Sequence, residues 1–324
     1  MATFLHDHKD FRDLLEIVAS EQKIKDPYLV EKDYWIMHCL WGLVDLGLKF
    51  ELKGGTSLSK GYQCINRFSE DIDIKINPHT LYKEPLFIGK NQQEEKHIES
   101  RKKFFDWILK FLDGKIHGLT SVMRDNNFDD EDSRSCGIRL VYKSHFGTPT
   151  GGLKDGVLLE IGFDTTTPNQ PLNISSWALE KAQNTPGVSV KDNSAKGVVC
   201  YEPKHTFVEK LQAVVKKFKQ YKDGKKGKGN LPENFIRHYY DLYQLIDRGD
   251  VQKFIGTSQY NEFKKERFKS LDNKVSNSDA FKLSNPDDRN LFEKEYNRSS
   301  DLYYKGRPTL DEIIQRFAKD LDRL

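Results

Sequence analysis

Several features that mark special classes of protein are scarce or missing in this chain. Only four cysteines occur among 324 residues, and they are far apart in the sequence: Cys39, Cys64, Cys136 and Cys200. No two of them form a Cys-x-x-Cys pair, so neither a zinc site nor a disulfide framework is indicated. No apolar run approaches the ~20 residues that a membrane-spanning helix needs, and the N-terminal sequence lacks the apolar segment of a signal peptide. We therefore expect a cytoplasmic protein with no membrane partner.

A strong excess of one charge is also missing. The 52 lysines and arginines nearly balance the 49 acidic residues, which leaves a formal net charge of +3. This excess is too small to indicate a nucleic-acid partner by itself. Hydrophobic residues make up 37% of the chain and charged residues 31%, a composition typical of a globular protein with a charged surface.

The most informative stretch is LKGGTSLSKGYQCINRFSEDIDIKI, which spans residues 52–76. Its last part alternates acidic and apolar residues, and in a strand residues i and i+2 point to the same face. Asp71 and Asp73 therefore share one face, opposite Ile72 and Ile74. Two neighbouring carboxylates repel each other unless a cation lies between them, and Mg²⁺ is the usual ion where oxygen ligands meet phosphates. We predict that both aspartates bind Mg²⁺, or Mn²⁺ in its place. The alternative is an edge strand with two solvated acids, although strands disfavour aspartate.

A glycine turn precedes the two aspartates. Gly54 and Gly55 follow a short strand-like stretch and lead into Thr56 and Ser57. Because glycines let backbone N–H groups approach a phosphate closely, we predict that these four residues bind the phosphates of a nucleotide. An ordinary Gly-Gly turn is the alternative, and the downstream aspartates argue against it.

Four separated segments together resemble a known family. A GG[ST] turn followed by an apolar-flanked DxD strand resembles the polymerase-β-like nucleotidyltransferases. The segments KGGTSLSK, RFSEDIDI, YLVEKDYWI (28–36) and HYYDLYQL (238–245) resemble more narrowly the AbiEii/MenT-type toxins of bacterial type IV toxin–antitoxin and abortive-infection systems. The resemblance spans roughly residues 28–245. It implies a nucleotidyltransferase that uses an NTP, and a cognate antitoxin as partner.

The resemblance and the hydrophobic pattern predict an α/β (α+β) fold. We expect a polymerase-β-like core with a small mixed sheet over residues 1–199, and a C-terminal helical bundle over residues 200–324. The expected strands are 49–53, 70–76, 137–144 and 156–164, with a turn at 148–152 between the last two. Helices are expected over 9–22, 29–47, 57–66, 92–113, 204–219, 232–247 and 250–270, and from a capping box at Thr309 onward. A polar connection is expected over 117–135 and a mobile segment over 271–290.

A third carboxylate is expected beside the two aspartates. Glu160 lies among apolar residues in VLLEIGFD, and a carboxylate in such a strand is rarely buried without a partner. The polymerase-β-like fold implies an acid on a neighbouring strand, which completes the metal site or serves as base toward the attacking hydroxyl. Glu160 is our candidate for this role, and Asp164 at the end of the same strand is the alternative.

The resemblance also implies functional roles for Lys210, Asp241 and Ser69. Lys210, in FVEKLQAVV, matches a family position at which lysine binds the nucleotide phosphates, whereas a surface lysine is the alternative. Asp241, in RHYYDLYQL, matches an acid that helps to place the nucleotide or the acceptor, although a surface acid would also fit the pattern. His238 stands where family members often have an earlier acid. Ser69 matches the RxSxDxD wording and would support the metal site.

A second family motif carries no chemistry that its spacing reveals. It consists of Glu31, Lys32 and Asp33 in VEKDYWI. We expect these residues to cap or brace the strand–turn–strand from behind.

A lysine-rich tract favours RNA as the acceptor. It includes two aromatic residues, Phe218 and Tyr221, among Lys216, Lys217, Lys219, Lys222, Lys225, Lys226 and Lys228. Charge paired with aromatic rings fits contacts to a nucleic-acid backbone and bases, and a solvated loop is the alternative. By resemblance, the acceptor is the 3′ end of tRNA and the outcome is growth arrest. A protein nucleotidyltransferase or kinase, and a non-catalytic NTP-binding module, stay open as alternatives.

Overall fold

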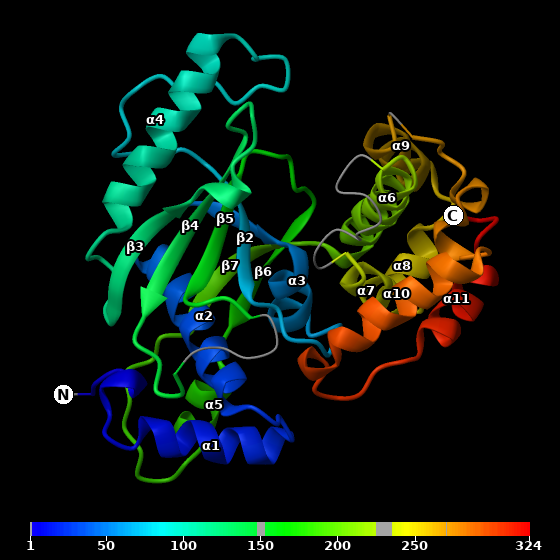
Figure 1. Ribbon diagram of the computed structural model, residues 1–324. Coiled ribbons are helices and arrows are strands. Elements are labelled where there is room, and N and C mark those ends of the chain that lie inside the picture. The colour runs from blue at the N-terminus through cyan, green and yellow to red at the C-terminus, as the bar shows by residue number, and fades with distance from the viewer. Residues whose placement is uncertain (1, 148–152, 225–234, 270) are drawn as a thin grey trace. The chain divides into compact units, whose positions relative to one another are not determined.

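The chain is divided into two structural units. The computed structural model describes residues 2–147, 153–224, 235–269 and 271–324. The first unit comprises Met1–Tyr62 and Phe68–Tyr201, and the second comprises Gln63–Arg67 and Glu202–Leu324 (Figure 1). The main division therefore lies between Tyr201 and Glu202, close to the predicted boundary at residue 199. The assignment of Gln63–Arg67 to the second unit was not predicted.

A seven-stranded mixed sheet in the order β3-β4-β5-β2-β1-β7-β6 forms the centre of the first unit. Its strands are β1 (Phe50–Lys53), β2 (Asp71–Ile76), β3 (Leu119–Asp125), β4 (Ser135–Tyr142), β5 (Val157–Gly162), β6 (Asn169–Ile174) and β7 (Ala195–Tyr201). The central strand β2 pairs antiparallel with β1 and parallel with β5, and β1 pairs parallel with β7. The mixed sheet with its helices confirms the predicted α/β fold class.

One face of this sheet is covered by helices. The first unit contains the short helix η1 (Leu5–Asp7) and the α-helices α1 (Phe11–Gln22), α2 (Pro27–Asp45), α3 (Gly54–Thr56), α4 (Glu95–Leu112) and α5 (Trp177–Gln183). The α2 helix contacts β2, β5 and β7, while α1 and α5 pack against α2 (Figure 1). Ile72, Ile74 and Ile76 of β2 are fully buried, and each such side chain contributes about 1.5–3 kcal/mol to stability. The apolar half of the DIDIKI pattern therefore fixes which face of β2 carries the aspartates.

The second unit is helical, as predicted. Its α-helices are α6 (Pro203–Lys222), α7 (Arg237–Ile246), α8 (Gly249–Phe254), α9 (Ser258–Arg267), α10 (Pro286–Arg298) and α11 (Leu310–Ala318). The long α6 helix contacts α7, α8 and α9, and α11 packs against α7. The described part of the predicted helix 232–247 is α7, and the predicted helix 250–270 is divided into α8 and α9.

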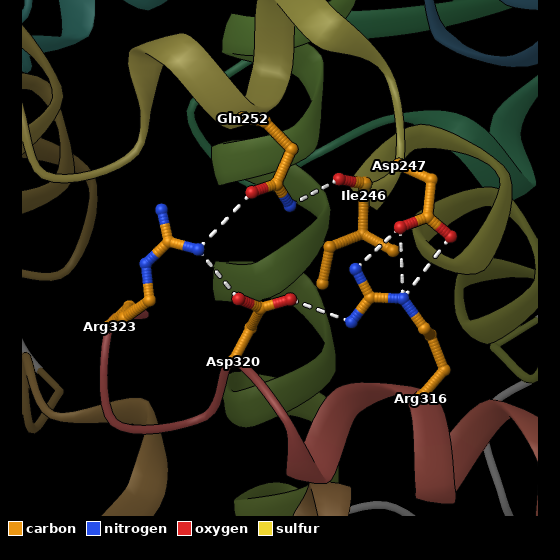
Figure 2. Close-up of polar contacts among 6 residues, drawn as sticks. All are labelled: Ile246, Asp247, Gln252, Arg316, Asp320 and Arg323. Atoms are coloured by element: carbon orange, nitrogen blue, oxygen red, sulfur yellow. Dashed lines mark hydrogen bonds and ion pairs between the residues drawn. The ribbon is translucent and has the colours of Figure 1, made fainter.

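Polar contacts fasten the C-terminal end of the chain to the segment that follows α7 (Figure 2). Arg316 of α11 donates to both carboxylate oxygens of Asp247 at 2.5–3.1 Å and to Asp320 at 2.6 Å. Arg323 donates to Asp320 at 2.7 Å and to Gln252 at 3.2 Å. A single exposed ion pair contributes less than about 1 kcal/mol, so these contacts stabilise the bundle mainly as a connected set.

Several elements were not predicted from the sequence, and two expectations were wrong. Three strands were missed: β7, which lies inside the sheet next to β6, and the two edge strands β3 and β6. The edge strands bury little and β6 contains a proline, so their sequences lack the pattern of a central strand. The expected polar connection over 117–135 contains β3. The segment 271–290 was expected to be mobile, yet it buries four apolar side chains in the second unit: Val275, Ala280, Phe281 and Leu283.

The capping box predicted at Thr309 is present at the start of α11. The Thr309 hydroxyl accepts from the Glu312 N–H at 3.2 Å, and the Glu312 carboxylate accepts from the Thr309 N–H at 2.7 Å. We predict that Thr309→Ala destabilises the second unit by about 1 kcal/mol, because one N–H at the helix start loses its partner. Thr309→Ser keeps the hydroxyl and serves as the control. Thermal unfolding measures both variants, and equal melting temperatures would contradict the prediction.

Candidate active site

Three adjacent strands bring charged side chains into one row on the face of the sheet opposite Ile72 and Ile74. In the strand register, Asp73 of β2 lies opposite Lys53 of β1 on one side and opposite Glu160 of β5 on the other. Asp71 points to the same face of β2, since burial alternates along this strand as predicted. The Lys53 ammonium forms an ion pair with Asp73 at 3.2 Å. The sheet thus gathers the three predicted carboxylates, whereas exposed Asp164 lies beyond the end of β5.

The carboxyl group of Glu160 has an unusual protonation equilibrium. Burial, and then the negative charges of Asp73 and Asp71, raise its pKa from 4.5 to about 8, and Lys53 and Lys154 only partly offset this effect. At neutral pH, Glu160 therefore keeps a proton that an ordinary glutamate would release. A bound cation would favour the charged form of Glu160 and release that proton.

The donor set of this row fits a hard divalent cation such as Mg²⁺. All three acids offer oxygen ligands, and acids on adjacent strands are close enough to share an ion. Among the described residues, however, the carboxylate oxygens of Asp71, Asp73 and Glu160 do not all lie within 4.8 Å of one another. Ion binding would therefore require the side chains to turn toward a common point.

The glycine segment begins a helix beside β2 rather than a turn before one. The α3 helix starts at Gly54 and continues through η2 (Ser57–Gly61), so the predicted helix 57–66 is wrong at both ends. Gly54 has a φ of +71°, and a Cβ placed there would lie 3.1 Å from the Asp73 carboxylate. A glycine is therefore required where the helix N-terminus meets the acids. The first N–H groups of this helix have no partner within the helix and are suited to bind phosphate.

The hydroxyl groups predicted to bind phosphate are both used inside the fold. Thr56 Oγ1 donates to the carbonyl oxygen of Asp71 at 2.5 Å, which ties the helix to β2. Ser57 is fully buried, and its Oγ donates to the carbonyl oxygen of Tyr201 at 3.4 Å. The phosphate-binding role predicted for Gly54–Ser57 therefore rests on backbone N–H groups in this structure. Ser69 is half-buried two residues before Asp71, and its supporting role stays a prediction.

Three consecutive charged residues of α2 are buried behind this site: Glu31, Lys32 and Asp33. Lys32 donates to Glu70, the residue before Asp71, at 3.3 Å and also to the carbonyl oxygen of Lys154. Asp33 pairs with Lys60 at 2.9 Å, near the end of the glycine helix. Glu31 accepts from the Ser144 hydroxyl at 2.6 Å and from the His145 N–H. The contacts agree with the predicted bracing of the strand–helix–strand from behind.

The second unit contains a buried ionic network around Asp241. Arg67 donates to both Asp241 oxygens at 2.6 and 2.8 Å, and Lys210 donates to Oδ2 at 2.7 Å. The two cations hold the pKa of Asp241 well below its ordinary value although the residue is fully buried. The sequence pattern RxSxDxD includes Arg67 but does not indicate its partner Asp241, because 174 residues separate the two. The predicted contacts of Lys210 and Asp241 with a nucleotide stay predictions.

The lysine tract is only partly described. Lys225, Lys226 and Lys228, like the predicted turn at 148–152, lie outside the described residues. Of the aromatic members, Phe218 is buried and packs against Phe292 at 5.8 Å between ring centroids. Tyr221 donates to Asp288 at 2.9 Å. Phe218 therefore belongs to the helical core and is not available at the surface for contact with RNA.

This arrangement agrees with a match between the sequence and a known protein family. A family described as "Nucleotidyl transferase AbiEii toxin, Type IV TA system" matches residues 35–322. The chain belongs to the AbiEii family. The match covers both aspartates of β2, Glu160, Lys210 and Asp241, and it continues well past residue 245, where the resemblance found in the sequence ended. Searches among curated proteins and among solved structures found no match.

Membership of the AbiEii family identifies the chain as a nucleotidyltransferase toxin of a type IV toxin–antitoxin system. It also implies an antitoxin as partner. Over the residues that the structure describes, no helix has the length and hydrophobicity required to span a bilayer.

The pKa of Glu160 predicts how stability depends on pH. Its pKa is about 8 when folded against 4.5 ordinarily, so this contribution is full below pH 4.5 and is lost as pH rises through 8. We predict that the stability of Glu160→Gln relative to the wild type rises by roughly 4 kcal/mol between pH 5 and pH 9. Thermal unfolding at both pH values measures this difference. Mg²⁺ at pH 9 should raise the melting temperature of the wild type more than that of the variant, and a pH-independent difference would oppose the assignment.

The Asp241 network predicts a large cost for removing its anion. We predict that Asp241→Asn destabilises the second unit by about 3–5 kcal/mol at pH 7, because Arg67 and Lys210 stay buried without a counter-charge. Since the folded pKa of Asp241 is depressed, its contribution is present above pH 3.8 and is lost only as pH falls further. Asp250→Asn is the matched control, since Asp250 forms an exposed pair with Arg248 at 3.0 Å and should cost under ~1 kcal/mol. Equal costs in urea denaturation would show that the network does not stabilise the unit.

Proposed function

We propose that this AbiEii-family protein transfers a nucleoside monophosphate from an NTP to RNA, with the 3′ end of tRNA as acceptor, in a Mg²⁺-dependent reaction. The observation that carries the proposal is the row of Asp71, Asp73 and Glu160 on adjacent strands, next to the N-terminus of a glycine-initiated helix. Acids suited to a cation thus adjoin N–H groups suited to a phosphate.

In the proposed reaction, each group of the row has a separate task. Asp71 and Asp73, with Glu160, would hold Mg²⁺, which neutralises the triphosphate and stabilises the charge that develops on its oxygens. The N–H groups of Gly54, Gly55 and Thr56 hold the phosphates in place. An acceptor hydroxyl then attacks the α-phosphorus, the bond to the bridging oxygen of the β-phosphate breaks, and pyrophosphate leaves.

Glu160 is the residue best suited to accept the proton of the attacking hydroxyl. Its pKa of about 8 lies near the pH at which an enzyme works, which suits a base that receives a proton from the attacking hydroxyl. The same carboxylate could instead serve as the third ligand of the ion. In both roles it must be ionised before transfer, so the rate should rise with pH until Glu160 has lost its proton.

An RNA acceptor is supported by charge rather than by stacking. Lys216 and Lys219 are exposed on the last turns of α6, and phosphate contacts of this kind are strongly salt-dependent. A protein acceptor, or transfer of the γ-phosphoryl group as in a kinase, would use the same acids. A module that binds NTP without turnover is less well supported, because it would not need three carboxylates in one row.

Transfer of labelled nucleotide to RNA tests the proposal. Purified protein, Mg²⁺, total tRNA and each of the four α-³²P-labelled NTPs are incubated together, and the products are separated on a denaturing gel. We expect label in tRNA with one or more NTPs. Asp71→Asn and Glu160→Gln should reduce transfer at least ~100-fold, since each removes a charged group required in the transition state.

Asp164→Asn is the matched control for this experiment, because Asp164 is an exposed acid of the same β5 region and should leave transfer unchanged. Label that enters protein instead of tRNA would show that the acceptor is a protein. Label transferred from γ-³²P-ATP alone would indicate a kinase, and saturable NTP binding with no transfer would contradict the proposed reaction.

A further inference from the structure

A second cluster of potential metal ligands lies in the first unit, on elements that the proposed reaction does not use. His6 and Asp7 belong to η1, and His117 lies in the connection between α4 and β3. His117 Nε2 is 3.0 Å from both Asp7 oxygens, and His6 Nε2 is 3.9 Å from Asp7 Oδ1. One ligand atom from each residue can be chosen so that all three lie within 4.8 Å of one another, which sets this group apart among the described histidines, cysteines and acids.

The His6 ring presents a nitrogen that the fold leaves unused. Its side chain is only 4% exposed, and Nε2 is buried without a hydrogen-bond partner in the described part of the chain. Nδ1, in contrast, lies 2.7 Å from the Tyr34 hydroxyl. A buried ring nitrogen without a partner is costly. When Nδ1 carries the ring proton and donates it to the Tyr34 hydroxyl, Nε2 has a free lone pair near the Asp7 carboxylate. A cation between Nε2 and that carboxylate would stabilise this arrangement.

The surrounding residues hold the His6 imidazole and the backbone of His117 in place. His38 Nε2 lies 2.9 Å from the carbonyl oxygen of His117, and Asn193 Nδ2 contacts both His38 Nδ1 at 2.8 Å and the Tyr34 hydroxyl at 3.3 Å. Outer partners of this kind fix the orientation of a metal-binding histidine. Gly118 has a φ of +81°, and a Cβ there would lie 2.6 Å from His6 Nε2. The backbone after His117 thus comes close to His6 because residue 118 lacks a side chain.

We propose that His6 Nε2, the Asp7 carboxylate and His117 Nε2 bind one divalent transition ion of the zinc class. Zn²⁺ binds histidine nitrogen and aspartate oxygen at about 2.0–2.2 Å, so tetrahedral ligands lie roughly 3.3–3.6 Å apart. The separations of 3.0 and 3.9 Å bracket this value. Two imidazoles and one carboxylate prefer such an ion to Mg²⁺, which favours oxygen ligands alone.

The bound ion would fasten the start of the chain to the connection between α4 and β3. A simple ion pair between Asp7 and His117 would explain their 3.0 Å contact, since both side chains are partly exposed. It would not explain why the buried Nε2 of His6, which has no hydrogen-bond partner in the described part of the chain, lies 3.9 Å from Asp7 Oδ1. With three protein ligands, the ion would keep one position open toward solvent.

Titration with Co²⁺, which replaces Zn²⁺ and has visible absorption, tests the site in metal-free protein. Mg²⁺ in excess competes for the carboxylate row, and Asp73→Asn is titrated in parallel to separate the two sites. We expect one equivalent of Co²⁺ with the strong visible bands of a four- or five-coordinate site in both proteins. His6→Gln and His117→Ala should each weaken binding at least ~100-fold, more than the loss of an outer partner does. Zn²⁺ should raise the melting temperature of the wild type by several degrees, as expected of a ligand that binds only the folded chain.

His8→Ala is the matched control, because His8 is an exposed neighbour paired with Asp10 at 3.6 Å, and it should bind Co²⁺ as the wild type does. His117 is 56% exposed, so its replacement should leave the fold intact even if a change at His6 does not. Failure of the wild type to bind a stoichiometric ion would overturn the proposal. Unchanged binding in His6→Gln would also overturn it, since Asp7 and His117 would then act alone.

Discussion

Repulsion among three carboxylates on one face of a sheet is the constraint on which the candidate active site depends. Asp71, Asp73 and Glu160 lie side by side because apolar residues on the other face of β2 and β5 must be buried. Burial, and then this excess of negative charge, raises the pKa of Glu160. Lys53 offsets part of it, and the N-terminus of the glycine helix adds the positive end of a helix dipole. In the proposed reaction, a cation and an anionic phosphate would bind here together and balance both charges.

The same constraint explains why so much charge is buried behind the site. Glu31, Lys32 and Asp33 of α2 each reach a different segment that frames the row: the chain after β4, the residue before β2, and the glycine helix. Buried ion pairs seldom add much net stability, yet breaking one is costly. Their contribution here is geometric, because they fix the strand and the helix against α2 so that acids and N–H groups face the same side.

The central strands and the candidate acids could be predicted from the sequence because their signals are local. Alternation in DIDIKI, glycines before a helix and an acid inside an apolar strand each depend on neighbouring residues. The edge strands β3 and β6 could not be predicted, since they bury little and owe their form to a partner strand. The interior strand β7 was also missed, because burial does not alternate regularly along its sequence AKGVVCY. Long-range pairs were missed for a related reason: nothing near Arg67 indicates Asp241, and nothing near His6 indicates His117. The hydroxyls of Thr56 and Ser57 have ordinary sequence surroundings, and only the fold shows that they donate to backbone carbonyls.

The measurement that tests the central claim most directly is a crystal structure with Mn²⁺ and a non-hydrolysable NTP, using the anomalous signal of manganese. The account predicts manganese held by Asp71 and Asp73, with the triphosphate against the N-terminus of the helix that begins at Gly54. Glu160 should then turn toward the ion or toward the space in front of the α-phosphorus. Nucleotide bound elsewhere, or bound with no manganese at the row, would contradict the account.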